Sequence, residues 1–325
     1  MVTSGAHPKI SILLPTHNRA DVLPFAVESA LYQTEQNFEL LIVGDGCTDD
    51  TANVVSSYLQ DKRIKWFDFP KGRSYGYDNR NKVLKQATGE YISFLAHDDI
   101  ISFDHLALLS NHLDQNPQID IVYSRSLWID DQGAIFPSIT NLHDKASLDA
   151  FFDLYNTIPA SCFMHRRSVF EKIGYWDEDL DRAADWDFWK KIFNREKSNF
   201  IFESTLTVFH FKAIWKSVDQ SWPADIHPIF QHLYSNRSKD TLKPLFLENS
   251  NGITLQECVL RNSKAEPGFI DSVRRSAIAL LDHILYHRFS TILLEMKPAP
   301  QEENVQKQSS IPEKGLMHKI KKIFS

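Results

Sequence analysis

Short apolar runs alternate with helical patterns over the first third of the chain. Four runs rich in β-branched and aromatic residues are typical of buried strands: residues 9–14, 38–43, 64–69 and 91–95. Three segments between them carry apolar residues at helical spacing: residues 21–33, about 48–59 and 77–87. We expect Thr48 or Asp49 to cap the second helix and Gly89 to end the third. The alternation predicts an α/β fold with a mostly parallel central sheet flanked by helices.

The pattern changes in the second part of the chain. From Ile119 onward two apolar runs surround Asp131-Gln-Gly133, which predicts a hairpin turn and antiparallel strands that extend the sheet. Trp186, Trp189 and Phe193 share one helical face and predict a helix over about residues 185–195. At least two of the nearby tryptophans are expected in the core, although stacking on a sugar ring is the alternative.

Strand signals fade after residue 215. We therefore predict a main domain over residues 1–215 and a C-terminal helical region over residues 216–297. Residues 298–325 are expected to form a polar linker and a short basic amphipathic tail. Such a tail lies on an anionic membrane surface or docks on a protein surface, and both alternatives stay open.

Composition places the chain among globular proteins. Its 325 residues are 42% hydrophobic, which is enough for a sizeable core. A net charge of −6 gives no overall attraction to nucleic acid. Three cysteines lie far apart without zinc spacing, and the N-terminus shows no apolar signal segment. We expect a cytoplasmic protein without a membrane span.

Three of the four segments that follow the predicted strands are rich in groups suited to polar ligands, and the carboxyl ends of the strands are where a parallel sheet binds its ligands. Asp98 and Asp99 end the fourth strand, and a shared Mg²⁺ or Mn²⁺ ion would offset their mutual repulsion. Helix capping is the other explanation for such a pair. Asp45 follows the second strand between Gly44 and Gly46, which permit close approach of a planar or phosphorylated ligand.

Three blocks of sequence resemble glycosyltransferase family 2. They read KISILLPTHNRADVLPFAVESALYQTEQNFELLIVGDGCTDDT, then YDNRNKVLKQATGEYISFLAHDD, then YWDEDLDRAADWDFWKKI. The resemblance covers roughly residues 8–200 and is greatest to enzymes of the spore-coat polysaccharide type. It implies the GT-A fold and sugar transfer with inversion from a nucleotide-diphosphate sugar to a carbohydrate or lipid-linked acceptor. Surface polysaccharide or glycolipid assembly, at the inner face of the membrane, is the implied setting.

The resemblance also implies a donor pocket. Asp45 matches the acid that meets the nucleobase, and Pro15, Thr16 and Asn18 fall in the segment that lines the same pocket. Arg80, in DNRNK, matches an arginine near the nucleotide. These residues are therefore expected to bind the donor.

The remaining implied residues concern chemistry. Asp98 matches the acid that serves the ribose, and Asp99 the acid that holds the divalent cation. Asp185 matches the catalytic base that removes the acceptor proton, with helix capping as its alternative role. Three positions carry no acid where relatives usually have one: Gly44, Ala96 and Ala184.

Two histidines are further candidates for the site, and two other functions are alternatives. His97 joins the metal shell or packs at the strand end, and His210 lies near where relatives place basic residues facing the diphosphate. Because Ala96 replaces an acid, a nucleotide-binding scaffold without catalysis is the main alternative. A nucleotidyltransferase is a more remote one, since no glycine-rich phosphate loop with a suitable lysine is present.

Overall fold

The computed structural model describes residues 7–129, 133–154, 156–193, 199–211, 245–246 and 254–295. The chain divides into two compact units, Met1–Ile284 and Leu285–Ser325. The strands belong to the first unit, and the last helix crosses the boundary in sequence. The predicted linker and tail at residues 298–325 lie outside the described residues.

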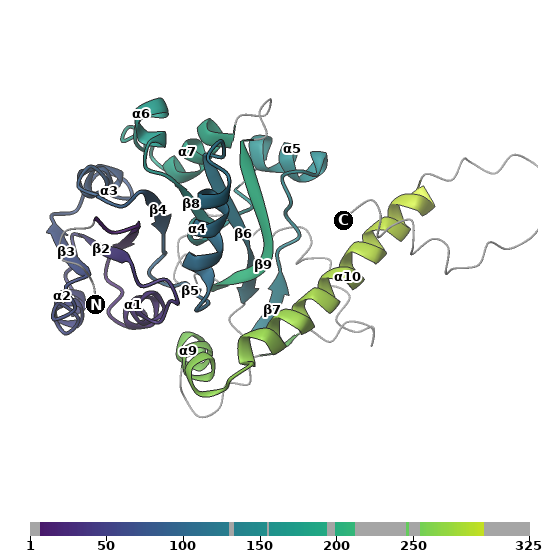
Figure 1. Ribbon diagram of the computed structural model, residues 1–325, viewed down its shortest axis with the longest axis horizontal. Helices are drawn as coiled ribbons and strands as arrows, with labels where there is room; N and C mark the ends of the chain where they lie inside the picture. The colour runs from purple at the N-terminus through teal and green to yellow at the C-terminus, as the bar shows by residue number, and fades with distance from the viewer. Residues whose placement is uncertain are drawn as a thin grey trace, which may run out of the picture. The chain divides into compact units, whose positions relative to one another are not determined.

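Four parallel strands form the first half of the sheet and confirm the predicted α/β pattern. They are β1 (Ile10–Thr16), β2 (Phe38–Asp45), β3 (Ile64–Phe69) and β4 (Tyr91–Phe94), in the order β4-β1-β2-β3. Helices α1 (Leu23–Leu31), α2 (Thr51–Ser56) and α3 (Tyr77–Leu84) alternate with them. In Figure 1, α3 lies above these strands, and α1 and α2 lie below them. Every residue of β2 is buried, which explains its continuous apolar run.

Glu39 is the polar exception within β2. Its carboxylate accepts hydrogen bonds from Ser11 Oγ at 2.6 Å, from Lys65 Nζ at 2.7 Å, and from the Thr88 N–H and hydroxyl at 2.8 and 2.9 Å. Although burial raises the pKa of Glu39, these bonds hold it below its usual value. The carboxylate thus joins β1, β2, β3 and the turn before β4.

Two predicted helix boundaries are wrong. α2 begins at Thr51, because Asp49 Oδ1 accepts the Thr51 N–H at 3.1 Å and forms a local turn before the helix. α3 ends at Leu84, so Gly89 does not end it directly. A Cβ on Gly89 would lie 2.4 Å from Ser11 N, so this glycine permits close contact with β1.

Strands β5 to β10 form the second half of the sheet. They are β5 (Ile100–Ile101), β6 (Ile121–Ile129), β7 (Ala134–Pro137), β8 (Phe163–Arg166), β9 (Phe200–Phe211) and β10 (Leu245–Phe246). The predicted hairpin is confirmed by the antiparallel pair β6 and β7, while residues 130–132 of its turn are outside the described residues. β8 pairs antiparallel with both β4 and β6, and β9 runs parallel to β6. β4, β6 and β9 therefore point in the same direction.

Helices pack around this second half. They are α4 (His105–Gln115), α5 (Lys145–Asp153), the short 3-10 helix η1 (Ala160–Cys162), α6 (Val169–Ile173) and α7 (Ala184–Phe193). α4 contacts β6, β8 and β9. The helix predicted over residues 185–195 is confirmed by α7. Trp189 and Trp176 are buried in the aromatic core, as expected, and the Trp186 indole donates to the Phe151 carbonyl at 2.7 Å.

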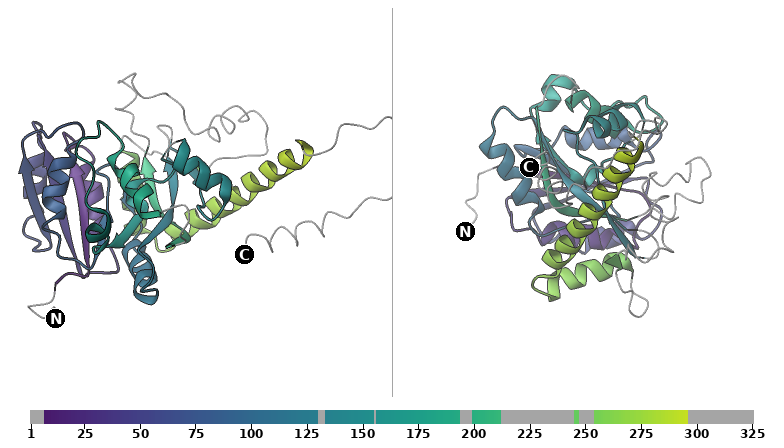
Figure 2. Two further views of the ribbon diagram at one scale, coloured as in Figure 1. Left: turned by 90° about the horizontal axis from the view of Figure 1, so that it is seen from above. Right: turned by 90° about the vertical axis from the view of Figure 1, so that its right-hand side faces the viewer.

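Two helices follow, α9 (Leu255–Ala265) and α10 (Phe269–Glu295). α9 contacts α1 and β5, and in the right-hand view of Figure 2 this green helix lies below the purple elements that begin the chain. Arg274 joins the start of α10 to the sheet by donating to both carboxylate oxygens of Asp104 and to the Leu206 carbonyl. The described part of the C-terminal region is thus largely helical, while the predicted boundary at residue 215 stays a prediction.

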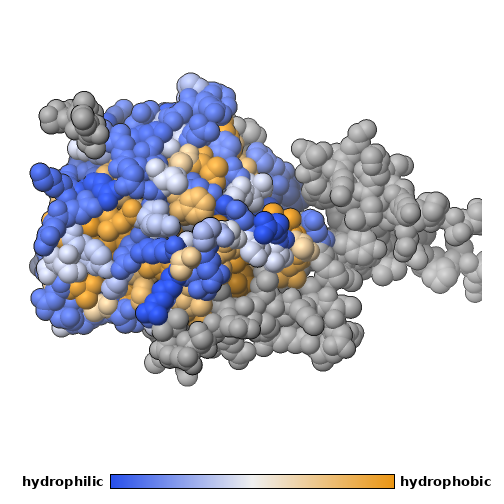
Figure 3. Space-filling view, turned by 60° about the horizontal axis from the view of Figure 1, so that its bottom comes forward, coloured by the Kyte–Doolittle hydropathy of each residue, from blue (hydrophilic) through white to orange (hydrophobic). Residues whose placement is uncertain are grey.

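On the face in Figure 3, hydrophobic residues appear in separate groups between hydrophilic ones. Within the described ranges, no helix combines the length and the apolar character that crossing a bilayer would need.

Candidate active site

The carboxyl ends of the parallel strands gather the predicted site residues at one edge of the sheet. Thr16 and Asp45 are the last residues of β1 and β2, and residues 95–99 follow β4. This edge is where an open α/β sheet offers room for a ligand. The loops after β1, β2 and β4 therefore lie at the same edge of the sheet.

Asp45 is the centre of the donor-side cluster. Its Oδ1 accepts the Gly72 N–H at 2.7 Å and the Asn79 side-chain amide at 2.8 Å, and its Oδ2 accepts the Lys71 ammonium. Burial raises the pKa of Asp45, but the bonds from Lys71, Gly72 and Asn79 outweigh it and hold the pKa below its usual value. Asp45 is an ionised carboxylate at neutral pH.

The loop after β3 is folded against this carboxylate. A Cβ on Gly76 would lie 2.4 Å from the Asp45 carboxyl, and Gly76 has a φ of +69°. A Cβ on Gly72 would lie 3.0 Å from Asp45 Oδ1. Only glycine meets both needs at position 76, namely the left-handed backbone and the close contact.

Asn18 links the loops after β1 and β2. Its Oδ1 accepts the Thr48 N–H at 2.7 Å and the Asp49 N–H at 3.3 Å, and its φ is 50°. His17 Nδ1 donates to the Asp45 carbonyl at 2.7 Å. Thr16 beside them is buried and Pro15 is half-buried. The predicted segment thus lies directly against the Asp45 strand end.

Arg80 interacts electrostatically with both Asp45 and Asp185. Its guanidinium is over the Tyr77 ring at 5.3 Å and the Trp176 ring at 5.4 Å. Burial lowers the pKa of Arg80, whereas Tyr77, Asp185 and Asp45 raise it, and a guanidinium stays charged in proteins. One cation therefore interacts with both predicted acids.

Asp185 is half-buried in the first turn of α7, where a carboxylate is favoured by the helix dipole. α7 begins at Ala184, so Asp185 lies within the helix and not at the N-cap, which was the alternative role expected for it. Burial and the negative charge of Asp185 raise the pKa of Tyr77, which places the phenol close to this acid. Tyr77 was missed in the sequence because nothing in its neighbourhood distinguishes it from a core tyrosine.

The acidic pair after β4 has unequal surroundings. Asp99 is fully enclosed: its Oδ2 accepts the Ser161 hydroxyl at 2.5 Å, and its Oδ1 accepts His210 Nδ1 at 2.8 Å. The Ser161 Oγ also accepts the Ala96 N–H at 3.0 Å. Asp98 is the less buried of the two acids, at 8% exposed against 1%.

Four contacts in the site had no clear signal in the sequence. Lys71 and Asn79 reach Asp45 from the loop after β3 and from α3, while Ser161 and His210 reach Asp99 from η1 and β9. Within the described ranges, no three side chains of His, Cys, Asp or Glu are grouped to hold a metal on their own.

The family comparison agrees with this geometry. A sequence model described as glycosyl transferase family 2 matches residues 11–174, about half of the chain. A PGL/p-HBAD biosynthesis glycosyltransferase of Mycobacterium bovis is 32% identical over 188 residues, which are 56% of this chain and 69% of that protein.

The chain belongs to glycosyltransferase family 2.

Other family members match in part. An uncharacterized glycosyltransferase of Rickettsia typhi is 32% identical over 192 residues, covering 57% of this chain and 58% of that protein. Protein CgeD of Bacillus subtilis is 31% identical over 202 residues, covering 57% of this chain and 46% of that protein. The chain thus spans between about half and two thirds of these relatives.

Solved structures show the same fold. S. aureus TarS 1-349 in complex with UDP-GlcNAc has a TM-score of 0.54 at 20% identity, over 72% of this family 2 chain and 68% of the TarS 1-349 chain. The TarS complex with UDP has a TM-score of 0.52 at 19% identity, over 85% and 89% of the two chains. The predicted GT-A glycosyltransferase fold is therefore confirmed.

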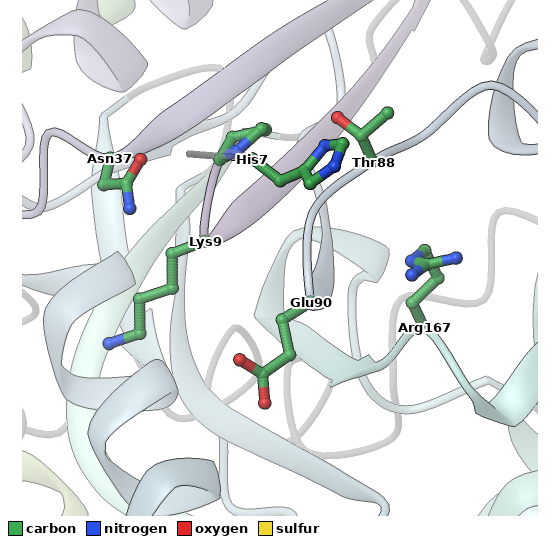
Figure 4. A pocket seen from close by; sticks show the side chains of 7 residues that line it. His7, Lys9, Asn37, Thr88, Glu90 and Arg167 are labelled. Atoms are coloured by element: carbon green, nitrogen blue, oxygen red, sulfur yellow. The ribbon is translucent and has the colours of Figure 1, made fainter. Parts of the chain in front are cut away.

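A polar hollow lies at the opposite edge of the sheet. It has a volume of about 450 Å³ and is lined by polar residues that include Lys9, Asn37, Glu90 and Arg167 (Figure 4). Lys9, Asn37 and Glu90 directly precede β1, β2 and β4, so the hollow is at the amino ends of the parallel strands. Family 2 chemistry is expected at the other end, where Asp45 and Asp185 lie.

Proposed function

We propose that this family 2 member transfers a sugar from a nucleotide-diphosphate sugar to an acceptor hydroxyl with inversion. The observation that carries the proposal is the position of Arg80, which interacts electrostatically with both Asp45 and Asp185. Arg80 thereby links two carboxylates with different roles. Asp45 is buried and ionised and is suited to accept a hydrogen bond from a nucleobase N–H, and Asp185 is suited to remove a proton. The TarS complexes with UDP-GlcNAc and UDP support a nucleotide-sugar donor.

In the proposed mechanism the protein's residues divide the work. Asp45 and the segment with Pro15, Thr16 and Asn18 hold the nucleoside. Asp185 accepts the proton of the acceptor hydroxyl as that oxygen attacks the anomeric carbon on the face opposite the diphosphate. The rigid start of α7 fixes its carboxylate, which raises the effective concentration of the base.

Asp98 and Asp99 provide the hard oxygen ligands that Mg²⁺ or Mn²⁺ prefers, so the residues fit a divalent cation. Such ions are commonly bound by one or two carboxylates together with substrate phosphates, so a third protein ligand is not required. When bound, the cation would neutralise charge that develops on the leaving diphosphate.

The test compares two carboxylates of the same helix turn. Asp185→Asn should lower turnover of a sugar-nucleotide panel about 100-fold or more, because a general base contributes roughly 10² to 10⁴. Its matched control is Asp187→Asn, since Asp187 also lies in the first turn of α7 but pairs with Lys191 at 2.6 Å. Both variants should keep the nucleotide-induced rise in melting temperature. Equal turnover in the two variants would remove Asp185 as the base.

The alternative function is a nucleotide-binding scaffold. Ala96 removes an acid at the strand end, and Asp99 is enclosed by protein partners. Calorimetry separates the two functions: nucleotide binding that is unaffected by Mn²⁺, with no turnover, supports the scaffold.

The setting is also a proposal. By analogy with the mycobacterial PGL/p-HBAD biosynthesis glycosyltransferase, we propose a part in glycolipid or polysaccharide assembly, with a carbohydrate or lipid-linked acceptor. A cytoplasmic protein held at the membrane by residues 313–325 fits this setting. Anionic liposomes should then bind the full chain and release it when that segment is deleted.

A further inference from the structure

Arg125, in the middle of β6, is a partly buried cation with no acidic partner among the described residues. Its guanidinium donates to the Ser138 carbonyl and lies 4.8 Å from the centroid of the Phe202 ring. Burial lowers the pKa of Arg125 to about 10, and no carboxylate in the described ranges offsets this effect. The guanidinium stays charged at neutral pH, and because it carries five N–H groups, several are left for another partner.

Two other partly buried arginines have their donors matched by the protein. Arg274 donates to both carboxylate oxygens of Asp104. Arg166 donates to three backbone carbonyls near the end of α4. Since a charge taken out of water costs free energy unless it is paired, the surroundings of Arg125 favour a negatively charged ligand.

A second unmatched polar group belongs to the segment that Arg125 contacts. The Thr140 N–H donates to Ser138 Oγ at 3.3 Å, and the Thr140 hydroxyl donates to the Thr157 carbonyl at 3.5 Å. Thr157 is buried, and no described group hydrogen-bonds to its Oγ1. Because buried hydroxyls are normally hydrogen-bonded, Thr157 and the spare N–H groups of Arg125 both call for a ligand that accepts hydrogen bonds.

These residues lie at the edge of the sheet that carries the acidic pair. The antiparallel pairing of β6 with β8, continued by two residues, brings Arg125 level with Ser161, whose hydroxyl donates to Asp99. Thr157 precedes Ser161 closely in the chain. The pairing of β6 with β9 is irregular on both sides of Arg125, and such irregular pairing is common beside functional sites, where it redirects a side chain.

The strand order separates Arg125 from the donor side of the site. In the order β6-β8-β4-β1-β2, Arg125 on β6 and Asp45 on β2 lie on opposite sides of the acidic pair that follows β4. We propose that Arg125 binds an anionic group of the sugar acceptor, a phosphate or a carboxylate that lies apart from the reacting hydroxyl. The planar guanidinium can donate to two oxygens of such a group at once. This inference rests on the proposed function, in which the nucleoside occupies the Asp45 side.

Inorganic phosphate and acetate are the probes, added to the full chain at constant ionic strength. The nucleoside diphosphate that binds best is present at saturating concentration to fill the donor side. At least one of the two anions should raise the melting temperature of the wild type, and Arg125→Met should weaken its apparent affinity about tenfold or more. Arg125→Lys should keep part of the affinity, because it retains the charge without the planar fork. A response to phosphate alone indicates a phosphate ester on the acceptor, and a response to acetate indicates a carboxylate.

Arg166→Met is the matched control, since it removes an arginine whose donors are used within the protein. It should lower the melting temperature by about 5 °C or more and leave the anion response unchanged. Arg125→Met should lower the melting temperature by less than about 3 °C, because it removes one hydrogen bond together with an unmatched charge. If Arg125→Met destabilises the protein as much as Arg166→Met and leaves the anion affinity unchanged, Arg125 is structural and the proposal fails.

The kinetic prediction concerns the two substrates separately. Arg125→Met should raise the KM of the acceptor about tenfold or more and keep the KM of the donor within about twofold. If the saturating nucleoside diphosphate abolishes the difference between wild type and Arg125→Met, Arg125 serves the donor phosphates and the assignment to the acceptor is wrong. A wild type that responds to neither anion also overturns the proposal. If no sugar is transferred, the proposed function fails, and the anion response still decides whether Arg125 is an anion site.

Discussion

Replacing Asp45 by asparagine tests how one carboxylate holds the donor-side loop in place. Asparagine keeps the shape but has one oxygen and one amide group. If its oxygen continues to accept from Gly72 and Asn79, its NH₂ group faces the Lys71 ammonium, which is also a donor. The variant therefore loses one ion pair and weakens two charge-assisted hydrogen bonds.

The expected cost follows from the exposure of each partner. The Lys71 side chain is 46% exposed, so its ion pair contributes only about 0.5–1 kcal/mol. The hydrogen bonds from Gly72 and Asn79 are buried or nearly so, and changing each from charged to neutral costs about 1 kcal/mol. We expect the free energy of unfolding at pH 7 to fall by about 2–3 kcal/mol.

The difference between wild type and variant should depend on pH. The pKa of Asp45 is lowered in the folded protein, since the bonds from Lys71, Gly72 and Asn79 outweigh the effect of burial. A lowered carboxylate pKa stabilises the fold above the unfolded pKa of about 3.9, and this stability is lost as the pH falls through the folded value. The stability difference should thus be full at pH 7 and shrink below about pH 4.

Urea unfolding followed by tryptophan fluorescence measures this difference. Asp50→Asn is the control, because Asp50 is exposed in the adjacent turn and should change stability by less than about 0.5 kcal/mol. A stability loss for Asp45→Asn that is the same at pH 3.5 and pH 7 would refute the assignment to charge. A stability loss no larger than that of Asp50→Asn would refute the contacts of Asp45 with Lys71, Gly72 and Asn79.

Two further predictions concern stability and donor binding. Glu39→Gln should lower the free energy of unfolding by about 2–4 kcal/mol in the same urea assay, because a buried carboxylate with four hydrogen-bond donors is lost. An unchanged urea midpoint would contradict this. Arg80→Lys should weaken nucleotide binding about tenfold by calorimetry, since an ammonium cannot stack flat on Tyr77 and Trp176 as a guanidinium does. Equal affinity of the lysine variant would show that only the positive charge of Arg80 matters.

The parallel half of the fold was predictable because burial on both faces produces continuous apolar runs. β1 to β4 match the four predicted runs to within a few residues at each end. β9 was missed because its twelve residues mix buried and exposed positions, and its pairing with β6 shifts register near Arg125. β10 has only two residues, too few for any periodicity to show.

The acids of the site were predictable, whereas their partners were not. Asp45, Asp98 and Asp185 follow strands or begin a helix, so local sequence identifies them. His210, one partner of Asp99, lies 111 residues away on β9, whose direction is set by two antiparallel pairings through β8 and a parallel pairing with β6. A sequence motif records which residues are acidic, but burial decides whether an acid meets the ligand or holds another side chain.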